Sequence, residues 1–93
     1  MKIVETQEYI DTLLGILEFI AKDKKSIAID FNKRLRSKIK TLKDFPFMYR
    51  KSIYFDDDNI RDLIYKGYVI PYKVDIKNNT IYIIGITKYK DKL

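Results

Sequence analysis

The residues best suited to chemistry in this sequence are an arginine at position 61 and a cluster of cations and a tyrosine near the C-terminus. Arg61, Lys88 and Lys90 could hold a phosphate group, with Tyr89 or a carboxylate as the base. RNA cleavage through a 2′-hydroxyl needs such groups, because charge develops on the phosphate while a proton leaves the hydroxyl. A solvated tail is the favoured alternative for Lys88 and Lys90. For Arg61 a surface or cross-strand ion pair is the commoner role.

The chain contains neither histidine nor cysteine. This excludes a thiolate nucleophile, a disulfide framework and a Ser-His-Asp triad, and it removes the usual zinc ligands. Asp56, Asp57 and Asp58 could hold a divalent cation, but consecutive aspartates in a turn are usually solvated. We therefore expect no metal and no cofactor. If the protein is an enzyme, it would be a metal-independent endoribonuclease.

Positive charge is concentrated in the second quarter of the chain. The net charge is +6, and residues 24–55 contain 10 basic and 2 acidic side chains, whereas residues 1–23 contain 2 basic and 5 acidic ones. A basic patch attracts polyanions or an acidic protein segment. Arg34 and Lys38, on the polar face of an expected helix, are therefore candidates for contacting a target or nucleic acid. A merely solvated helix face explains them equally well.

The length of 93 residues and the 46% hydrophobic content predict one globular domain over residues 1–93. A domain this short is only marginally stable alone, so a partner that covers apolar surface would stabilise it. The N-terminus turns polar directly after Val4, and no apolar run approaches the length of a membrane span. We expect a cytoplasmic protein that does not bind membranes.

Apolar residues at three- and four-residue steps predict two helices joined by a short polar link. A short strand at Ile3-Val4 precedes the first helix, for which Thr6 is a plausible N-cap. The second helix would be capped by Asp23 or Ser26 and would end before Pro46. The apolar face of the first helix consists of Ile10, Leu13, Leu14, Leu17, Ile20 and Ala21. That of the second consists of Ala28, Phe31, Leu35, Ile39 and Leu42.

Three strand-like runs follow, at residues 60–65, 68–75 and 80–87. The last is apolar on both faces, which indicates a central strand. Pro71 cannot donate a ladder hydrogen bond, so its strand should have a free edge or a bulge there. The order β-α-α-β-β-β predicts an α+β fold, in which an N-terminal helical hairpin packs on one face of an antiparallel sheet.

This order resembles the RelE/ParE toxin superfamily of type II toxin–antitoxin systems, and two segments of the sequence are similar to that family as well. Residues 39–46 resemble its "I-x-x-L-x-x-x-P" segment. Residues 61–74 resemble its "R-x-L-x-x-G-x-Y-x-I-x-Y-x-V" block, here with one residue fewer before the tyrosine Tyr68. The run 81–86 matches the last apolar strand, so the resemblance covers nearly the whole chain.

The resemblance implies a growth-inhibiting toxin with one of two targets. RelE-like members cut mRNA in the ribosome, and ParE-like members poison DNA gyrase. Ribosome-dependent members carry an arginine where this chain has Val69, and an arginine and a tyrosine near the C-terminus where it has Lys88 and Tyr89. These departures favour the ParE branch, although this chain also lacks the arginine or histidine that ParE-like members often carry after their last strand. A decayed member that binds only its antitoxin or nucleic acid is a third hypothesis.

The resemblance further implies a cognate antitoxin that wraps its toxin with a helix and an extended strand to form a hetero-oligomer. Leu13, Leu17 and Ile20 on the first helix would receive the antitoxin helix, and the strand edge near Pro71 would receive the extended segment. The basic patch would attract an acidic antitoxin tail.

Overall fold

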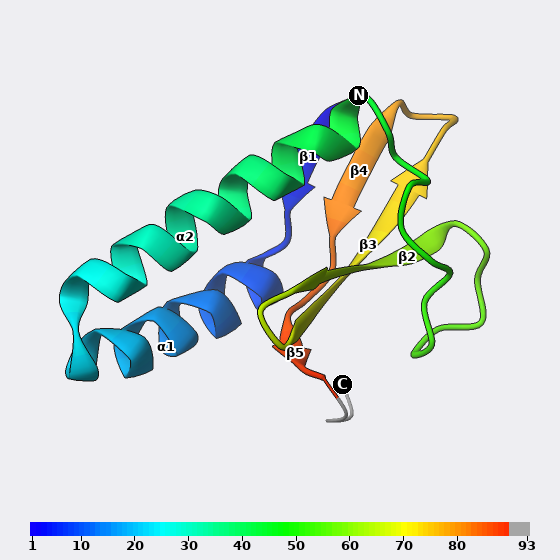
Figure 1. The fold of residues 1–93 in the computed structure, drawn as a ribbon. Coiled ribbons are helices and arrows are strands. Elements are labelled where there is room, and N and C mark those ends of the chain that lie inside the picture. The colour runs from blue at the N-terminus through cyan, green and yellow to red at the C-terminus, as the bar shows by residue number, and fades with distance from the viewer. Residues whose placement is uncertain (90–93) are drawn as a thin grey trace.

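The computed structural model describes residues 1–89 and shows two long helices lying on one face of a sheet (Figure 1). This arrangement confirms the predicted α+β class with an N-terminal helical hairpin. None of the helices within residues 1–89 is long and apolar enough to cross a bilayer. The elements are β1 (Lys2–Glu5), α1 (Gln7–Asp23), α2 (Lys25–Lys40), the 3-10 helix η1 (Thr41–Lys43), β2 (Ile60–Tyr65), β3 (Tyr68–Asp75), β4 (Thr80–Ile83) and β5 (Thr87–Lys88).

The start of α1 is tied to the sheet by its N-cap residue. The Thr6 hydroxyl accepts a hydrogen bond from the Tyr9 amide and donates one to the Ile83 carbonyl at 2.7 Å. The predicted cap is therefore confirmed. The second cap was predicted wrongly, because α1 continues through Asp23 and Lys24 alone separates the helices, without a side-chain cap. A one-residue link leaves no room for Asp23 or Ser26 outside the helices.

Five strands form one sheet in the order β1-β4-β3-β2, with β5 pairing to β3. The hairpin β2–β3 is antiparallel, and Lys66 and Gly67 in its two-residue turn both have positive φ. The expectation of a wholly antiparallel sheet was wrong, because β1 runs parallel to β4. Both helices and two strands separate β1 from β4 along the chain, so no tight turn forces them to be antiparallel.

Strand β3 lies inside the sheet and has no free edge at Pro71. Asp62 of β2 is opposite Pro71, and the Ile84 amide donates to the Pro71 carbonyl from the other side. Tyr72 pairs with Ile83 and Val69 with Thr87, so three residues lie opposite two between these pairs. The extra residue is a bulge-like break, and it divides the predicted strand 80–87 into β4 and β5. The predicted free edge at Pro71 was therefore wrong, and the bulge-like break lies in the facing strand, between β4 and β5, rather than in the strand of Pro71.

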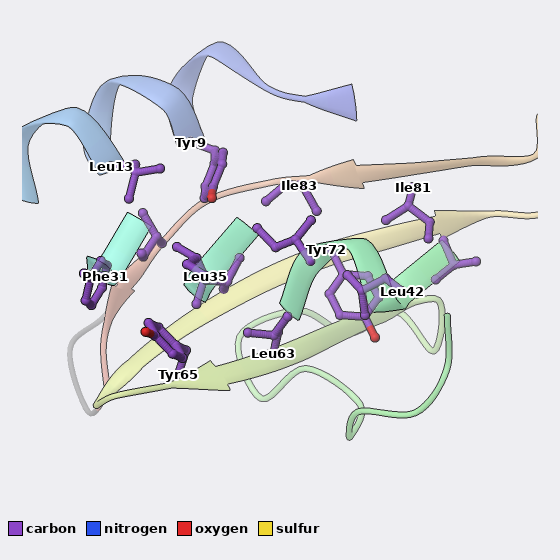
Figure 2. Close-up of a cluster of buried hydrophobic side chains, with 14 residues drawn as sticks. Tyr9, Leu13, Phe31, Leu35, Leu42, Leu63, Tyr65, Tyr72, Ile81 and Ile83 are labelled. Carbon is purple, nitrogen blue, oxygen red and sulfur yellow. The ribbon is translucent and has the colours of Figure 1, made fainter. Parts of the chain in front are cut away.

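The core fills the space between the helices and the sheet (Figure 2). The predicted stripe of the second helix is buried in it from Phe31 as far as Leu42 in η1. Alternate residues of β2 and β3 face the helices, so their neighbours in sequence face the opposite side of the sheet. The largest fully buried apolar side chains of the core are Tyr9, Leu35, Leu42, Leu63, Ile70, Tyr72, Ile81 and Ile83.

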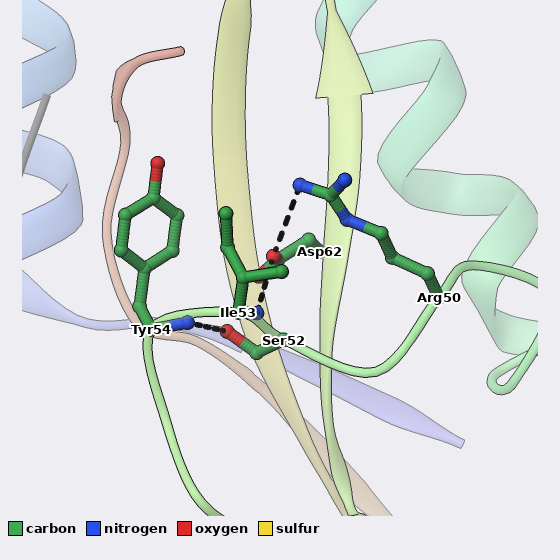
Figure 3. A network of polar contacts seen from close by, with 5 residues as sticks. All are labelled: Arg50, Ser52, Ile53, Tyr54 and Asp62. Atoms are coloured by element: carbon green, nitrogen blue, oxygen red, sulfur yellow. Dashed lines mark hydrogen bonds and ion pairs between the residues drawn. The ribbon is translucent and has the colours of Figure 1, made fainter. Parts of the chain in front are cut away.

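The segment of residues 44–59, which connects η1 to β2, crosses the edge of the sheet. Tyr49 near its start packs against the core beside Tyr72, and Ile53 lies on the opposite side of β2, at Asp62. This segment runs along the outer edge of β2, where the Ser52 amide donates to the Ile60 carbonyl and the Asp62 amide donates to the Arg50 carbonyl. The fully buried Asp62 carboxylate then accepts a hydrogen bond from the Ile53 amide at 3.0 Å and pairs with Arg50 at 3.5 Å (Figure 3). A buried polar side chain therefore holds this segment in place.

Candidate functional surfaces

An apolar groove lies between α1 and α2 on the side that faces away from the sheet. Leu14 on α1 is 53% exposed and Ile29 on α2 is 61% exposed, although both are large aliphatic side chains. A helical hairpin on a sheet buries one side of each helix, so apolar side chains on the outer side remain uncovered. The groove has a volume of about 280 Å³ and is lined by Leu14, Leu17, Glu18, Ala21, Lys25, Ala28, Ile29 and Asn32.

The four residues predicted to contact an antitoxin occupy different environments. Leu17 lines the groove between the helices, and Ile20 is half-buried against the core. Leu13 belongs to the core and Pro71 is fully buried within the sheet, so neither side chain is available at the surface. The helical period marked Leu13 and Leu14 as one face, and only the packed structure shows which of them meets the sheet.

A second groove lies between α1 and β5, where the outer edge of β5 faces the helix. Phe19 at its rim is 70% exposed. The volume is about 440 Å³, and the lining residues are Thr12, Gly15, Ile16, Phe19, Tyr68, Ile86, Thr87 and Lys88. Within residues 1–89, β5 pairs only with β3, so its other edge offers backbone groups to an extended segment. This edge, rather than Pro71, is suited to strand addition.

Arg61 is engaged in holding the 44–59 segment. Its guanidinium donates to the Asp58 and Tyr49 carbonyls, each at 3.1 Å, and lies 4.8 Å from the centre of the Phe47 ring. These contacts fix a loop against the start of β2. Arg61 therefore has a structural role through carbonyls and a ring, rather than through the expected surface or cross-strand ion pair.

The C-terminal candidates lie at the other end of the sheet from Arg61. Arg61 is opposite Tyr72 on β3, whereas Lys88 is opposite Tyr68. Four residues of strand separate these positions, a distance of roughly 13 Å. Arg61 is therefore not assembled with Lys88 and Tyr89. Lys90 lies outside the described residues.

Tyr89 instead contacts Arg50, a residue that the sequence analysis missed. The Tyr89 amide donates to the Gly67 carbonyl at 2.8 Å, and the Arg50 guanidinium lies 5.8 Å from the centre of the Tyr89 ring. Arg50 also pairs with Asp62. Nothing in the local sequence marks Arg50, because its position depends on how the 44–59 segment crosses the edge of β2.

Arg34 and Lys38 lie together beside the turn between β2 and β3. They line a pocket of about 440 Å³ with Asp30, Lys33, Ser37, Tyr65 and Lys66. Asp30 accepts a hydrogen bond from the Arg34 guanidinium at 2.9 Å, and this contact raises the pKa of Arg34. Arg34 and Lys38 were predicted from the sequence as parts of one surface, whereas Lys66 and Tyr65 were not, since the hairpin turn brings the last two to the helix.

Asp57 and Asp58 of the 56–58 run lie in ordinary turn and ion-pair contacts. Asp57 accepts from the Asn59 amide and pairs with Lys73 at 3.6 Å, and Asp58 pairs with Lys51 at 3.2 Å. Among residues 1–89, no three acidic, histidine or cysteine side chains are grouped as metal ligands would be. These aspartates therefore fix the turn before β2.

The two helices on one face of a five-stranded sheet, with exposed apolar and basic surfaces, define a small α+β protein. Residues 3–92 match the family described as the ParE toxin of the type II toxin–antitoxin system, parDE, so the chain belongs to that family. This confirms the RelE/ParE resemblance and its ParE branch.

A solved structure described as the chromosomal ParDE TA system from P. aeruginosa has the same fold. Its TM-score is 0.75 at 15% sequence identity, and the match covers 95% of this chain and 95% of that one. No curated protein matches the sequence. At this identity the structural match concerns the fold alone.

Proposed function

We propose that this chain is a growth-inhibiting toxin that binds DNA gyrase in the cytoplasm and is neutralised by a cognate antitoxin. Membership of the ParE family supports this proposal. The observation that carries the preference for gyrase over the ribosome is the separation of Arg61 from Lys88 and Tyr89 by roughly 13 Å of sheet. RNA cleavage requires its base and cations around one phosphate.

The position that follows Tyr68 also argues against ribosome-dependent cleavage. Val69 replaces the arginine of the ribosome-dependent members, and it is fully buried. An apolar buried side chain there can neither bind phosphate nor neutralise its developing charge. Lys88 supplies a point charge without the planar fork of an arginine.

We further propose that the antitoxin covers the two grooves on either side of α1. An amphipathic helix would place its apolar side chains in the groove around Leu14, Leu17 and Ile29. An extended segment would pair with the free edge of β5. The toxin and antitoxin would thus form a hetero-oligomer, and the antitoxin would bury the apolar side chains that the toxin alone exposes.

The target is tested by adding the purified protein to a DNA gyrase supercoiling assay and by pulse-labelling bacteria just after induction. We expect loss of supercoiling and an early loss of thymidine incorporation. Loss of methionine incorporation first, with gyrase unaffected, would contradict the gyrase proposal. If neither incorporation changes and growth continues, the decayed, binding-only interpretation replaces both.

The antitoxin surface is tested with an exposed pair of substitutions. Leu14→Ser with Ile29→Ser removes two anchors of the groove, so co-purification with the cognate antitoxin should fall sharply while the fold is kept. Ile76→Ser is the matched control, because Ile76 is 68% exposed on the turn between β3 and β4, away from both helices. Equal binding by the pair and by the control would place the antitoxin elsewhere.

A second candidate function, a metal-independent endoribonuclease, is supported by the contact between Arg50 and Tyr89. An arginine close to a tyrosine ring could stabilise a phosphate while the tyrosine hydroxyl moves a proton. Tyr89→Phe distinguishes the two functions. It would abolish mRNA cleavage on ribosomes, whereas inhibition of gyrase by the proposed toxin does not require a phenolic proton.

A further inference from the structure

The pocket between α2 and the β2–β3 turn gathers four cations that come from two separate parts of the chain. Lys33, Arg34 and Lys38 lie on one side of α2, and Lys66 comes from the hairpin turn. Asp30 is the one carboxylate in the lining, so the lining carries a net charge of +3. Like charges gathered around a cavity of about 440 Å³ repel one another, and an anion in the cavity relieves that repulsion.

The pocket lies on the helical segment formed by α2 and η1, which carries the whole net charge of the protein. Residues 25–43, which form α2 and η1, contain 7 basic and 1 acidic side chains, a net charge of +6, and the other residues balance to zero. From Lys33 to Lys43 the cations extend over roughly 15 Å of helix. A row of cations of this length can pair with several successive negative charges of a polyanion, whereas a single small ion would pair with only part of it.

A hydroxyl at the pocket has no partner of its own. Tyr65 is 5% exposed, it lines the pocket, and its buried hydroxyl has no hydrogen-bond partner within residues 1–89. Tyr65 lines the same pocket as Arg34 and Asp30, and burial raises the pKa of Tyr65 so that its phenol stays protonated. A protonated phenol there can donate to an acceptor, and the Ser37 hydroxyl offers a second donor.

We propose that this pocket binds a phosphate group of a nucleic-acid backbone, with Arg34, Lys38 and Lys66 as cations and Tyr65 as a hydroxyl donor. Arg34 would exchange its contact with Asp30 for the phosphate, which a planar guanidinium can hold with two hydrogen bonds. The remaining basic residues of α2 would track neighbouring phosphates. The proposal does not depend on which protein target the toxin has.

The surroundings of the pocket favour nucleic acid over an acidic peptide. No large apolar side chain is exposed between residues 33 and 43, whereas Ile27 and Ile29 are exposed on the first half of the same helix. Peptides and protein segments dock through apolar anchors or a strand edge. A nucleic-acid backbone binds through charge and needs neither.

The test measures the binding of a short fluorescein-labelled DNA duplex by fluorescence polarisation over a series of salt concentrations. The pocket variant is Arg34→Gln with Lys38→Gln, and the matched control is Arg36→Gln with Lys40→Gln. Both remove two charges from α2, but Arg36 and Lys40 lie outside this pocket, beside Ile3 and Glu5. We expect the pocket variant to lose roughly tenfold more affinity than the control, because it loses charge-assisted hydrogen bonds as well as general attraction.

Tyr65→Phe distinguishes specific binding in the pocket from general electrostatic attraction, because it changes no charge. We expect it to weaken duplex binding roughly threefold and to leave the salt dependence unchanged. Equal losses in the two charge variants, or duplex binding by Tyr65→Phe equal to that of the unmodified protein, would overturn the proposal. Circular dichroism of each variant confirms that the comparison is between folded proteins.

Two further probes identify the ligand chemistry. Inorganic phosphate, compared with chloride at the same ionic strength, should shift the amide resonances of Ser37 and Lys66, as expected if a single phosphate group occupies the pocket. A poly-glutamate peptide should compete with the duplex only weakly. Competition as strong as that of unlabelled duplex would mean that the pocket recognises carboxylates and would overturn the nucleic-acid assignment.

Discussion

The two faces of the sheet are covered by different physical means. The helices cover one face with apolar side chains, among them Tyr9 and Leu35, against Leu63 and Ile83 (Figure 2). On the other side of β2, residues 50–53 of the 44–59 segment make polar contacts that meet at the buried Asp62 (Figure 3). Apolar burial is non-directional and scales with area, whereas a hydrogen bond requires one particular partner. The first cover should therefore determine global stability, and the second should depend on single groups.

The largest effect that this comparison predicts is on the helix-covered face. Leu35→Ala removes a fully buried side chain between α2 and the sheet and should lower the free energy of unfolding by about 2–5 kcal/mol. Urea unfolding followed by circular dichroism measures it. Leu14→Ala is the control, since Leu14 is more than half exposed and its loss should change stability little. Equal losses for the two variants would show that α2 contributes no more to the core than the surface of α1 does.

A smaller and more local effect is expected at Asp62. Asp62→Ala leaves the Ile53 amide without its acceptor and should cost about 1–3 kcal/mol. Amide hydrogen exchange should accelerate in residues 50–57 far more than in α1 or α2. Asp62→Asn keeps an acceptor oxygen and should retain part of the protection. Uniform acceleration over the whole chain would mean that the segment unfolds with the core and is not held separately.

The same comparison explains which parts of the fold could be predicted from the sequence. Both helices and the strands at 60–65 and 68–75 follow from the period of apolar residues, because the core on the helix-covered face requires that period. The roles of Arg61 and Asp62 could not be predicted in this way, since both act on backbone groups of a segment without any period. The direction of β1 and the position of β3 inside the sheet are likewise set by tertiary pairing rather than by local sequence.

The candidate surfaces also contain residues that helical spacing predicts and residues that it does not. Helical spacing identified the basic side chains Arg34 and Lys38 as one polar face, and the structure places them in one pocket. It could not separate the buried Leu13 from the exposed Leu14, because both fit the same apolar stripe. Arg50, Tyr65 and Lys66 join their surfaces through a loop crossing and a hairpin turn, which a periodic pattern does not encode.

Two buried tyrosines should differ by about 1 kcal/mol in what their hydroxyls contribute to stability. The Tyr72 hydroxyl donates to the Pro46 carbonyl at 2.7 Å and so ties the 44–59 segment to the core, whereas the Tyr9 hydroxyl is buried without a partner in the described part of the chain. Tyr72→Phe should therefore destabilise the protein, and Tyr9→Phe should be neutral or stabilising. Urea unfolding of the two variants measures the difference, and destabilisation by both would show that Tyr9 has a polar partner in solution.

Alkaline pH should act on the same pair of tyrosines. Burial, as the largest cause, raises the pKa of both Tyr9 and Tyr72 above the ordinary value for tyrosine. A raised pKa in the folded state means that this contribution to stability is complete below the unfolded pKa of about 10 and is lost as the pH rises above it. The two phenylalanine variants should each lose less stability between neutral pH and strongly alkaline pH than the unmodified protein does. An unchanged dependence in both variants would assign the alkaline transition to other groups.

The smallest effect lies outside both covers, in the turn between β3 and β4. The Asp75 carboxylate accepts hydrogen bonds from the Asn78 side chain at 2.8 Å and from its amide at 3.1 Å, and these contacts hold the pKa of Asp75 below its ordinary value. A lowered folded pKa means that this contribution is complete above the unfolded value and is lost as the pH falls through the folded one. Asn78→Ala removes the stronger donor, so the pKa of Asp75 should move up toward its ordinary value in a carboxyl-carbon NMR titration. Because Asp75 touches neither cover, the hydrogen exchange of Ile53 and of the two helices should stay unchanged. A change in the exchange of Ile53 or of the helices would mean that the hairpin turn unfolds together with them. The two faces of the sheet would then differ in packing but not in stability.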